Sequence, residues 1–320
     1  MKNTAKTWLI IAVSLVLIGG TVFISVMSKL GWDFSKLSTS KFETNYYKIQ
    51  EDYQNISIIT DTADIVFVPS ENAVGEVVCY EQENKKHSVI VQNGTLTIKI
   101  NDTRKWYEHI GLNFSTPKIT VSIPHGEYRT LSIISSTGDV NIPRQFKFEC
   151  IDISESTGTV TNFASTSTLL KIKTSTGNIR VENISAAEVD LSVSTGNVNV
   201  SNVTCEGNVK INVSTGKATI SDTICQNIIS SGNTGDISLK NVISGEMITV
   251  ERSTGDVKLN SCDATEIYIK TDTGDVCGSL LSEKLFITQT DTGRIDVPED
   301  ATGGKCKIIT STGNIRIEIE

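Results

Sequence analysis

The sequence predicts an all-β fold, a parallel β-solenoid with 19–20 residues per coil, preceded by one N-terminal transmembrane helix. A Thr-Gly dipeptide recurs ten times at intervals of 19 or 20 residues, apolar and polar residues alternate on both sides of it, and an uncharged apolar segment fills residues 7–27. A fixed period in this range is typical of repeat proteins, in which each unit buries its apolar face only against its neighbours. The turn glycines are Gly138, Gly158, Gly177, Gly196, Gly216, Gly235, Gly255, Gly274, Gly293 and Gly313.

Each repeat unit is expected to contain a strand, a tight Thr-Gly corner, a second strand and a looser return. All ten units carry an apolar residue seven positions before the glycine and two after it, and eight of ten do so five before and four after it. This period-2 alternation, rich in β-branched residues, indicates strands with one buried face. Asp or Asn follows the glycine in seven of the ten units, and both suit a turn.

Copies joined head to tail place equivalent strands side by side, so the units are expected to stack in parallel about 4.8 Å apart. The alternative is a leucine-rich repeat, which needs a longer unit, an L-x-x-L-x-L-x-x-N pattern and a helical return. The returns in this chain, such as residues 183–188, are too short for a helix. We therefore assign residues 131–320 to a ten-coil β-solenoid.

Residues 42–130 are expected to hold a degenerate first coil followed by an inserted hairpin and capping region. In residues 56–68, Ala63 takes the place of the glycine, and Asn93-Gly94 is a strong signal for a hairpin turn. The residues that fall in buried positions of the degenerate coil are Ile56, Ile58, Ile65 and Phe67. The other predicted strands are residues 74–80, 88–92, 95–100 and 118–123.

The front of the chain divides into a short cytoplasmic N-terminus (1–6), a transmembrane signal anchor (7–28) and a tether (29–41). The apolar stretch is long enough to span a bilayer as a helix, and two lysines before it favour a cytoplasmic N-terminus. A cleaved signal peptide is the alternative, but the length of the stretch and the lack of an A-x-A site favour a retained anchor. The expected location is the cell membrane, with a single pass and the C-terminal domain outside the cytoplasm.

Charge and cysteine content limit the partners. Without Lys2 and Lys6, 27 basic residues face 37 acidic ones, a net charge of −10, which does not attract nucleic acid. The seven cysteines follow neither a disulfide framework nor a paired C-x-x-C zinc pattern. Cys262 and Cys306 fall in buried positions. Cys205 and Cys225 occupy equivalent places in adjacent coils, where either a disulfide or two stacked free thiols would fit.

The anchor, the degenerate coil, the Asn93-Gly94 hairpin and the serial [Thr/Ser]-[Ser/Thr]-Gly-[Asp/Asn]-[Ile/Val] units resemble the bacterial "putative adhesin" family of short β-strand repeats, a domain of unknown function. The resemblance covers residues 42–320. It implies a parallel β-solenoid on the surface of a Gram-positive or related cell, and some members of the family accompany cell-envelope stress systems. The family offers no catalytic residues to carry over.

Acidic residues near the corners form a weak candidate calcium site. Like charges about 5 Å apart in stacked coils repel, and calcium binds oxygen-rich clusters of this kind. The spacing differs from that of nonapeptide calcium repeats, and exposed carboxylates are common without a metal. The candidate residues are Asp236, Asp256, Asp272, Asp275 and Asp291.

No enzyme is expected, and no cofactor other than calcium. Only three histidines occur, all outside the regular repeat, so a hydrolytic triad or a zinc enzyme has little to build on. Acidic clusters on a β-helix also suggest a carbohydrate-active enzyme, but the returns are too short to form its cleft.

The segment 104–114 is the candidate contact surface, because three aromatic residues gather there in a chain with few of them. Aromatic and arginine side chains are favoured at interface centres, whereas the alternative is that this loop caps the open end of the stack. The candidate partner-binding residues are Arg104, Trp106, Tyr107 and Phe114. At the other end, residues 315–320 are expected to form an uncapped last strand. Its alternating charges would discourage edge pairing, or the strand would instead dock on a partner.

These patterns favour a non-enzymatic, membrane-anchored β-solenoid that acts as an adhesin or as a recognition and display module at the cell surface. A cell-wall polymer or an envelope protein is the expected partner, besides the membrane itself. An accessory or sensor protein of a cell-envelope stress response is the main alternative, followed by a carbohydrate-active enzyme.

Overall fold

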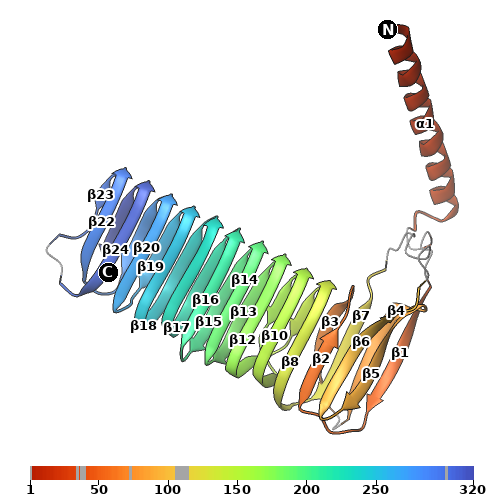
Figure 1. The fold of residues 1–320 in the computed structure, drawn as a ribbon, viewed down its shortest axis with the longest axis horizontal. Helices are drawn as coiled ribbons and strands as arrows, with labels where there is room; N and C mark the ends of the chain where they lie inside the picture. The colour runs from red at the N-terminus through yellow and green to blue at the C-terminus, as the bar shows by residue number, and fades with distance from the viewer. Residues whose placement is uncertain (1, 34–35, 37–40, 72–73, 105–114, 300–301) are drawn as a thin grey trace.

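The computed structural model describes the chain except for residues 1, 34–35, 37–40, 72–73, 105–114 and 300–301. The described residues form one helix followed by a long stack of strands (Figure 1). The helix, α1, spans Lys2–Lys29. Its segment Ala5–Lys29 is long and apolar enough to cross a membrane, so it could act either as an anchor or as a signal peptide.

In the described part of the chain, seven strands precede the regular repeat. They are β1 (Phe42–Ile49), β2 (Asn55–Ile59), β3 (Asp64–Ser70), β4 (Gly75–Gln82), β5 (Lys85–Gln92), β6 (Thr95–Asp102) and β7 (Lys118–Pro124).

The regular repeat contains strands of two kinds. Those that lead into a corner are β8 (Gly126–Thr137), β10 (Phe146–Thr157), β12 (Ser165–Thr176), β14 (Glu188–Thr195), β16 (Asn208–Thr215), β20 (Glu266–Thr273), β22 (Lys284–Thr292) and β24 (Gly304–Thr312). Those that leave a corner are β9 (Val140–Ile142), β11 (Val160–Asn162), β13 (Ile179–Ala186), β15 (Val198–Cys205), β19 (Val257–Cys262), β21 (Val276–Leu280), β23 (Ile295–Asp296) and β25 (Ile315–Ile319). In β17 (Ala218–Thr234) and β18 (Ile237–Thr254) one long strand does both.

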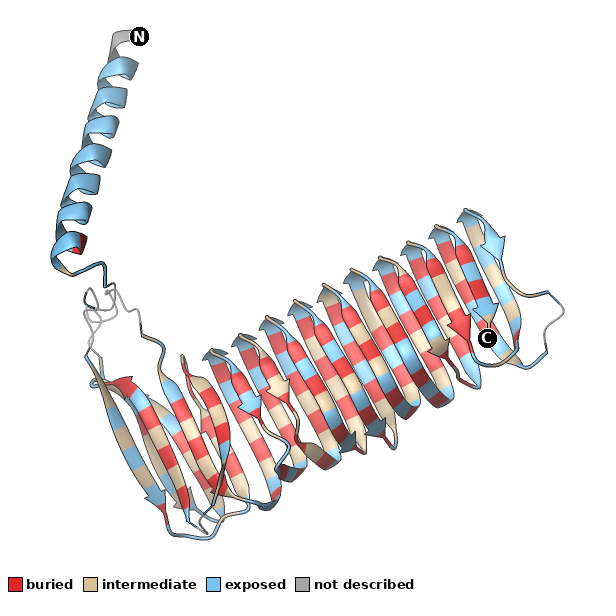
Figure 2. Ribbon diagram, turned by 180° about the vertical axis from the view of Figure 1, so that it is seen from behind, coloured by how far each residue is buried: buried red, intermediate tan, exposed pale blue. Residues whose placement is uncertain are grey.

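Strands of the same kind pair in parallel from coil to coil. One ladder runs from β8 through β10, β12, β14 and β16, and the other from β9 through β11, β13 and β15. Inward-facing apolar residues fill the space between the ladders, and buried residues alternate with more exposed ones along most of the strands (Figure 2). The predicted parallel β-solenoid is therefore confirmed.

The Thr-Gly corner depends on close approach of successive coils. Gly196 has φ 145°, and a Cβ on it would lie 1.7 Å from the carbonyl oxygen of Gly177 in the coil below. Only glycine allows this conformation and this contact. The Asp or Asn after the glycine closes the corner, because its side-chain oxygen accepts a backbone N–H of the next coil: Asn197 donates to Asn178 (3.0 Å) and Asp256 donates to Asp236 (3.1 Å).

The return is tighter than the sequence suggests. Six residues after the glycine, five coils place a non-glycine residue at a φ of 49–56°. This residue bends the strand, and the inward-facing side chains beyond it are displaced by one position in the sequence. Amide side chains stack at this second corner, where Asn202 donates to Asn183 (2.7 Å) and Asn241 to Asp222 (2.9 Å). The five residues are Asn183, Asn202, Asp222, Asn241 and Ser261.

The buried interior contains two charged side chains beside the Thr-Gly corner. Glu155 is 3% exposed, and neither carboxylate oxygen has a hydrogen-bond partner within the described residues; burial raises its pKa to about 7. Arg252 is 4% exposed; its Nη1 donates to the carbonyl oxygen of Val213 (2.6 Å), while Nε and Nη2 find no partner in the described part of the chain. Its guanidinium passes the side-chain position of Gly232, where a Cβ would lie 1.8 Å from Nη1.

The coils are out of chain order at both ends of the stack. The last coil, β24 and β25, lies between β20–β21 on one side and β22–β23 on the other. At the front, β2 lies between β6 and β8, and β3 between β7 and β9. β2 and β3 thus stack directly on the first regular coil, with Ile56, Ile58, Ile65 and Phe67 all buried.

The expectation of an uncapped C-terminal edge strand at residues 315–320 is wrong. β25 is paired on both sides, and the edge belongs to the earlier coil β22–β23 instead. For this reason Ile295, which the repeat pattern places inward, is 45% exposed.

The N-terminal end is closed by antiparallel strands. β4 pairs with β7 and then with β1, while β5 pairs with β6 through the predicted Asn93-Gly94 turn, whose residues have φ values of 51° and 71°. The sequence reasoning did not anticipate β1. The Tyr47 hydroxyl on β1 donates to the carbonyl of His87 on β5 (2.9 Å), so the two outermost strands are joined across the end of the core.

Candidate binding groove

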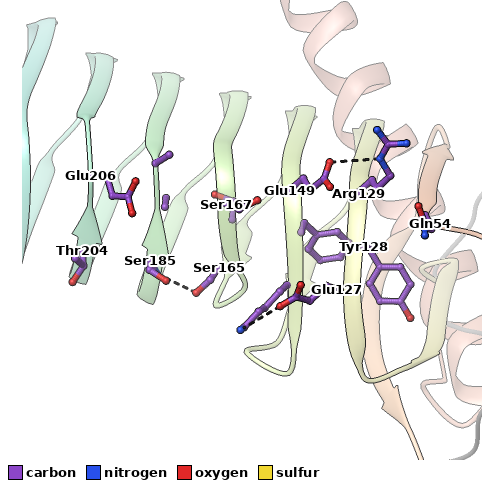
Figure 3. Close-up of a pocket in the computed structure, with 15 residues that line it drawn as sticks. Gln54, Glu127, Tyr128, Arg129, Glu149, Ser165, Ser167, Ser185, Thr204 and Glu206 are labelled. Carbon is purple, nitrogen blue, oxygen red and sulfur yellow. Dashed lines mark hydrogen bonds and ion pairs between the residues drawn. The ribbon is translucent and has the colours of Figure 1, made fainter.

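A groove of about 680 Å³ crosses the returns of successive coils near the N-terminal end of the stack (Figure 3). Its walls come from β8, β10, β12, β13 and the end of β15, so it runs across the strands from one coil to the next. The lining side chains that carry polar groups are Gln54, Glu127, Arg129, Lys147, Glu149, Ser165, Thr166, Ser167, Ser185, Thr204 and Glu206.

Charged side chains at one end of the groove form two ion pairs between adjacent coils. Arg129 Nε lies 3.6 Å from Glu149 Oε2, and Lys147 Nζ lies 3.5 Å from Glu127 Oε1 (Figure 3). All four side chains are more than half exposed, so each pair contributes little to stability and exchanges readily with water or a ligand.

Beyond the ion pairs the groove is lined by hydroxyl groups. Ser165 Oγ accepts the backbone N–H of Ser185 (3.0 Å), which ties β12 to β13 at the groove. Ser167 and Ser185 are exposed, and Ala186 and Ala187, which follow Ser185 and also line the groove, are too small to fill the hollow. The surface therefore offers hydrogen-bond donors and acceptors one coil apart.

A local irregularity opens the groove. The pairing of β10 with β12 shifts between Phe148 and Cys150, so that β12 carries an extra residue there, and Thr168 donates to the backbone carbonyl of Glu149. Bulges of this kind are common beside functional sites because they redirect side chains. These coils also turn back through Pro143 and Ala164 rather than through the stacked Asn corner of later coils.

Aromatic rings support the groove from below. Tyr128 and Phe148 pack with ring centroids 5.7 Å apart, and Phe146 contacts Tyr128 at 6.4 Å. Tyr128 is 8% and Phe148 2% exposed, so the rings hold the floor rigid but present little face to a ligand. Recognition in the groove would therefore rest on polar contacts.

Among the described residues, no three aspartates of the candidate calcium site lie close enough to hold one ion, although Asp236, Asp256 and Asp275 stack on adjacent coils. Asp236, Asp256 and Asp275 each accept a backbone N–H of the neighbouring coil, at 2.7–3.1 Å. Asp272 and Asp291 lie before their corners, and Asp272 lines a separate shallow pocket. Calcium binding by these residues stays a prediction, and the hydrogen bonds give three of them a role in closing the corner.

The candidate contact surface falls largely outside the described residues, since Trp106, Tyr107 and Phe114 all lie in 105–114. Arg104 is described, and its side chain contacts Asp102, with Nε donating to Oδ1 at 2.8 Å. This contact lowers the pKa of Asp102. Neither the interface nor the capping role of the segment is tested.

All seven cysteines are free thiols. Cys262 and Cys306 are fully buried, as predicted from their positions. Cys205 and Cys225 are also buried and unbridged, so the structure favours two free thiols over the disulfide. Burial raises the pKa of both, to about 12 for Cys225.

Sequence reasoning missed the groove. Its one signal was the absence of Asn or Asp at the second corner in the first two regular coils, where Arg144 and Ala164 stand in place of Asn183 and its equivalents. That difference could not be interpreted until the role of the stacked Asn residues was known.

The fold and the groove define a class of protein: a parallel β-solenoid with an N-terminal apolar helix and a polar surface groove. Comparison with protein families matches residues 53–214 and 206–320 to the Toastrack family, a domain of unknown function numbered DUF4097. The chain therefore belongs to the Toastrack family. This solenoid family suggests a non-enzymatic protein.

Several solved structures are similar to the chain. A "putative adhesin" from Parabacteroides distasonis is 11% identical with a TM-score of 0.49, over 87% of this chain and 98% of that one. A "putative lipid binding protein" from the same species is 17% identical with a TM-score of 0.47, over 88% and 98%. A "putative adhesin" from Bacteroides fragilis is 16% identical with a TM-score of 0.43, over 87% and 97%. None of the curated proteins compared with the chain matches it.

Proposed function

We propose that the protein is a non-enzymatic, membrane-anchored recognition module whose solenoid presents the polar groove to a cell-wall polymer outside the cytoplasm. The observation that carries this proposal is the groove itself, which crosses successive coils and offers exchangeable ion pairs at one end and exposed hydroxyls beyond them. An extended polymer can repeat the same contact from coil to coil, because the coils repeat at about 4.8 Å.

The groove has features of a binding site and lacks those of a hydrolase. Two of its carboxylates, Glu127 and Glu149, face cations, and the groove lining includes no histidine or cysteine. A glycoside hydrolase needs one carboxylic acid held protonated beside a second carboxylate. The exposed, paired carboxylates of the groove do not provide this arrangement.

The proposal is tested with the full chain in detergent micelles and purified cell-wall polymer fractions. Ser167→Arg places a long charged side chain in the groove and is expected to weaken binding at least about tenfold, which corresponds to a loss of about 1.4 kcal/mol. Ser194→Arg is the matched control, because Ser194 is equally exposed and lies outside the groove. Equal binding by the two variants, or none by the wild type, would contradict the assignment.

If the partner is instead the envelope protein named above, the chain should capture that protein from membrane extracts and should not bind the polymer. A stress sensor is distinguished by deleting residues 1–28: the remaining chain keeps its polymer affinity if it is a recognition module, whereas a regulator that acts through the membrane segment loses its effect.

A further inference from the structure

A buried group of three metal-binding side chains lies away from the groove, inside the N-terminal cap formed by the antiparallel strands β1, β4, β5, β6 and β7. Cys79 and Glu81 stand on β4 and His87 on β5, and they are 0%, 1% and 3% exposed. Within the described residues, this is where a thiol sulfur, a carboxylate oxygen and an imidazole nitrogen all lie within 4.8 Å of one another. The alternation of β4 explains the pair, since residues two apart point to the same face.

From this arrangement we infer that Cys79, Glu81 and His87 bind one zinc ion, which fastens β5 to β4 at the end of the stack. Thiolate, imidazole and carboxylate together form a typical zinc ligand set, whereas calcium and magnesium prefer oxygen ligands only. The three protein ligands leave the fourth tetrahedral position to a water molecule.

Neighbouring residues already orient the ligands. Thr60 Oγ1 lies 2.9 Å from Nε2 of His87, which turns Nδ1 toward Glu81. Asn45 Nδ2 donates to Oε1 of Glu81 (2.7 Å) and leaves Oε2 facing the histidine. Outer contacts of this kind, to the far nitrogen of a histidine and to a ligating carboxylate, are what metal sites use to fix their ligands.

The present geometry needs one small adjustment. Glu81 Oε2 lies 2.6 Å from His87 Nδ1, while two ligands of a tetrahedral zinc ion lie about 3.5 Å apart. The carboxylate must therefore withdraw by about 1 Å, which also lengthens the 2.7 Å hydrogen bond that the backbone N–H of His87 donates to Oε2.

The charges balance when zinc enters. With the carboxylate ionised and the imidazole neutral, the group carries a net charge of −1. Zinc binding sends the Cys79 thiol proton to solvent and moves the imidazole proton from Nδ1 to Nε2, which then donates a hydrogen bond to Thr60 Oγ1. The divalent ion, one thiolate and one carboxylate then sum to zero, the state that costs least to bury.

The test uses the full chain in detergent micelles, freed of metal by a chelator and titrated with cobalt(II). A thiolate-to-cobalt charge-transfer band in the near ultraviolet, with the strong visible bands of tetrahedral cobalt, should saturate at one cobalt per chain and disappear when zinc is added. Absence of the charge-transfer band in the wild type would overturn the inference, whatever the variants do.

Two variants and one control variant locate the site. Cys79→Ser should abolish the charge-transfer band, whereas Cys306→Ser, which changes another fully buried thiol far along the stack, should retain it. Glu81→Gln keeps the side-chain shape and should weaken cobalt binding at least about tenfold. A band that survives in Cys79→Ser would place the metal elsewhere and refute the assignment. If Cys79→Ser does not fold, the affinity of Glu81→Gln decides, and unchanged affinity refutes it equally.

Discussion

Replacing one corner glycine tests whether close approach of the coils determines the fold. In Gly196→Ala the new Cβ would lie 1.7 Å from the carbonyl oxygen of Gly177, although real Cβ atoms stay beyond 3.0 Å from such atoms. The two coils must therefore separate by about 1.3 Å at this corner. Alanine must also adopt a φ of 145°, a conformation that side chains rarely adopt.

The expected cost follows from the bonds that this separation breaks. The N–H of Gly177 to the carbonyl of Thr195 and the N–H of Ile179 to that of Asn197 are both 2.9 Å long and cross the same gap. Losing two backbone hydrogen bonds at about 1 kcal/mol each, with backbone strain of about 2 kcal/mol, lowers the free energy of unfolding by about 4 kcal/mol.

The assay is urea unfolding of the full chain in detergent, followed by circular dichroism in the β-sheet region. Hydrogen–deuterium exchange should locate the loosening in the coils next to residue 196, because repeats contact only their neighbours. Gly245→Ala is the matched control: its Cβ would meet nothing closer than 3.8 Å and its φ is not positive, so stability should change by less than about 1 kcal/mol. Equal losses in the two variants would refute the argument from close approach.

Three further predictions concern buried groups. The pKa of Glu155 is raised from 4.5 to about 7, so its contribution to stability is fully present below about pH 4.5 and is lost as the pH rises through 7. In urea titrations, Glu155→Gln should therefore be more stable than the wild type by about 3 kcal/mol near pH 8 and of similar stability near pH 5. A difference in stability that stays the same at both pH values would refute this. Arg252→Met removes a buried guanidinium with two unpaired nitrogens and should raise the free energy of unfolding by about 1–2 kcal/mol, while a marked loss would show that its bond to Val213 outweighs desolvation. All seven thiols should react with a thiol reagent after unfolding without reductant, and a count of five would reveal a disulfide.

The fold could be predicted because its determinants are local and repeated. Glycine at the corner has a physical role in every coil, Asp or Asn after it has one in most coils, and nearly all the alternating apolar positions face inward where the sequence places them. The sheet direction followed from the repeat itself, since identical units joined head to tail must stack in parallel.

The order of the coils at the ends could not be predicted in the same way. Strands of equivalent coils carry nearly the same pattern of apolar residues. Residues 304–319 therefore do not indicate whether their coil stacks outside β22–β23 or between β22–β23 and the rest of the stack. Pairing between such strands is decided by non-local packing, in which the last coil gains neighbours on both sides.

The sites were the least predictable part. The groove depends on a register shift between Phe148 and Cys150, and the cap cluster depends on β5 folding back over β4, neither of which has a signal in a single sequence. The inward orientation of Glu155 was also hidden, because a polar residue three positions before the glycine appears to belong to the turn.

The position of the last coil determines how the molecule responds to tension. β25 is bonded on both flanks, and the Glu320 carboxylate beyond it accepts hydrogen bonds from Ser261 and Ser279. A pull on the C-terminus must therefore shear two rows of bonds together, where an outermost strand would peel away one bond at a time. A tip that resists peeling suits a rod that is loaded from its far end.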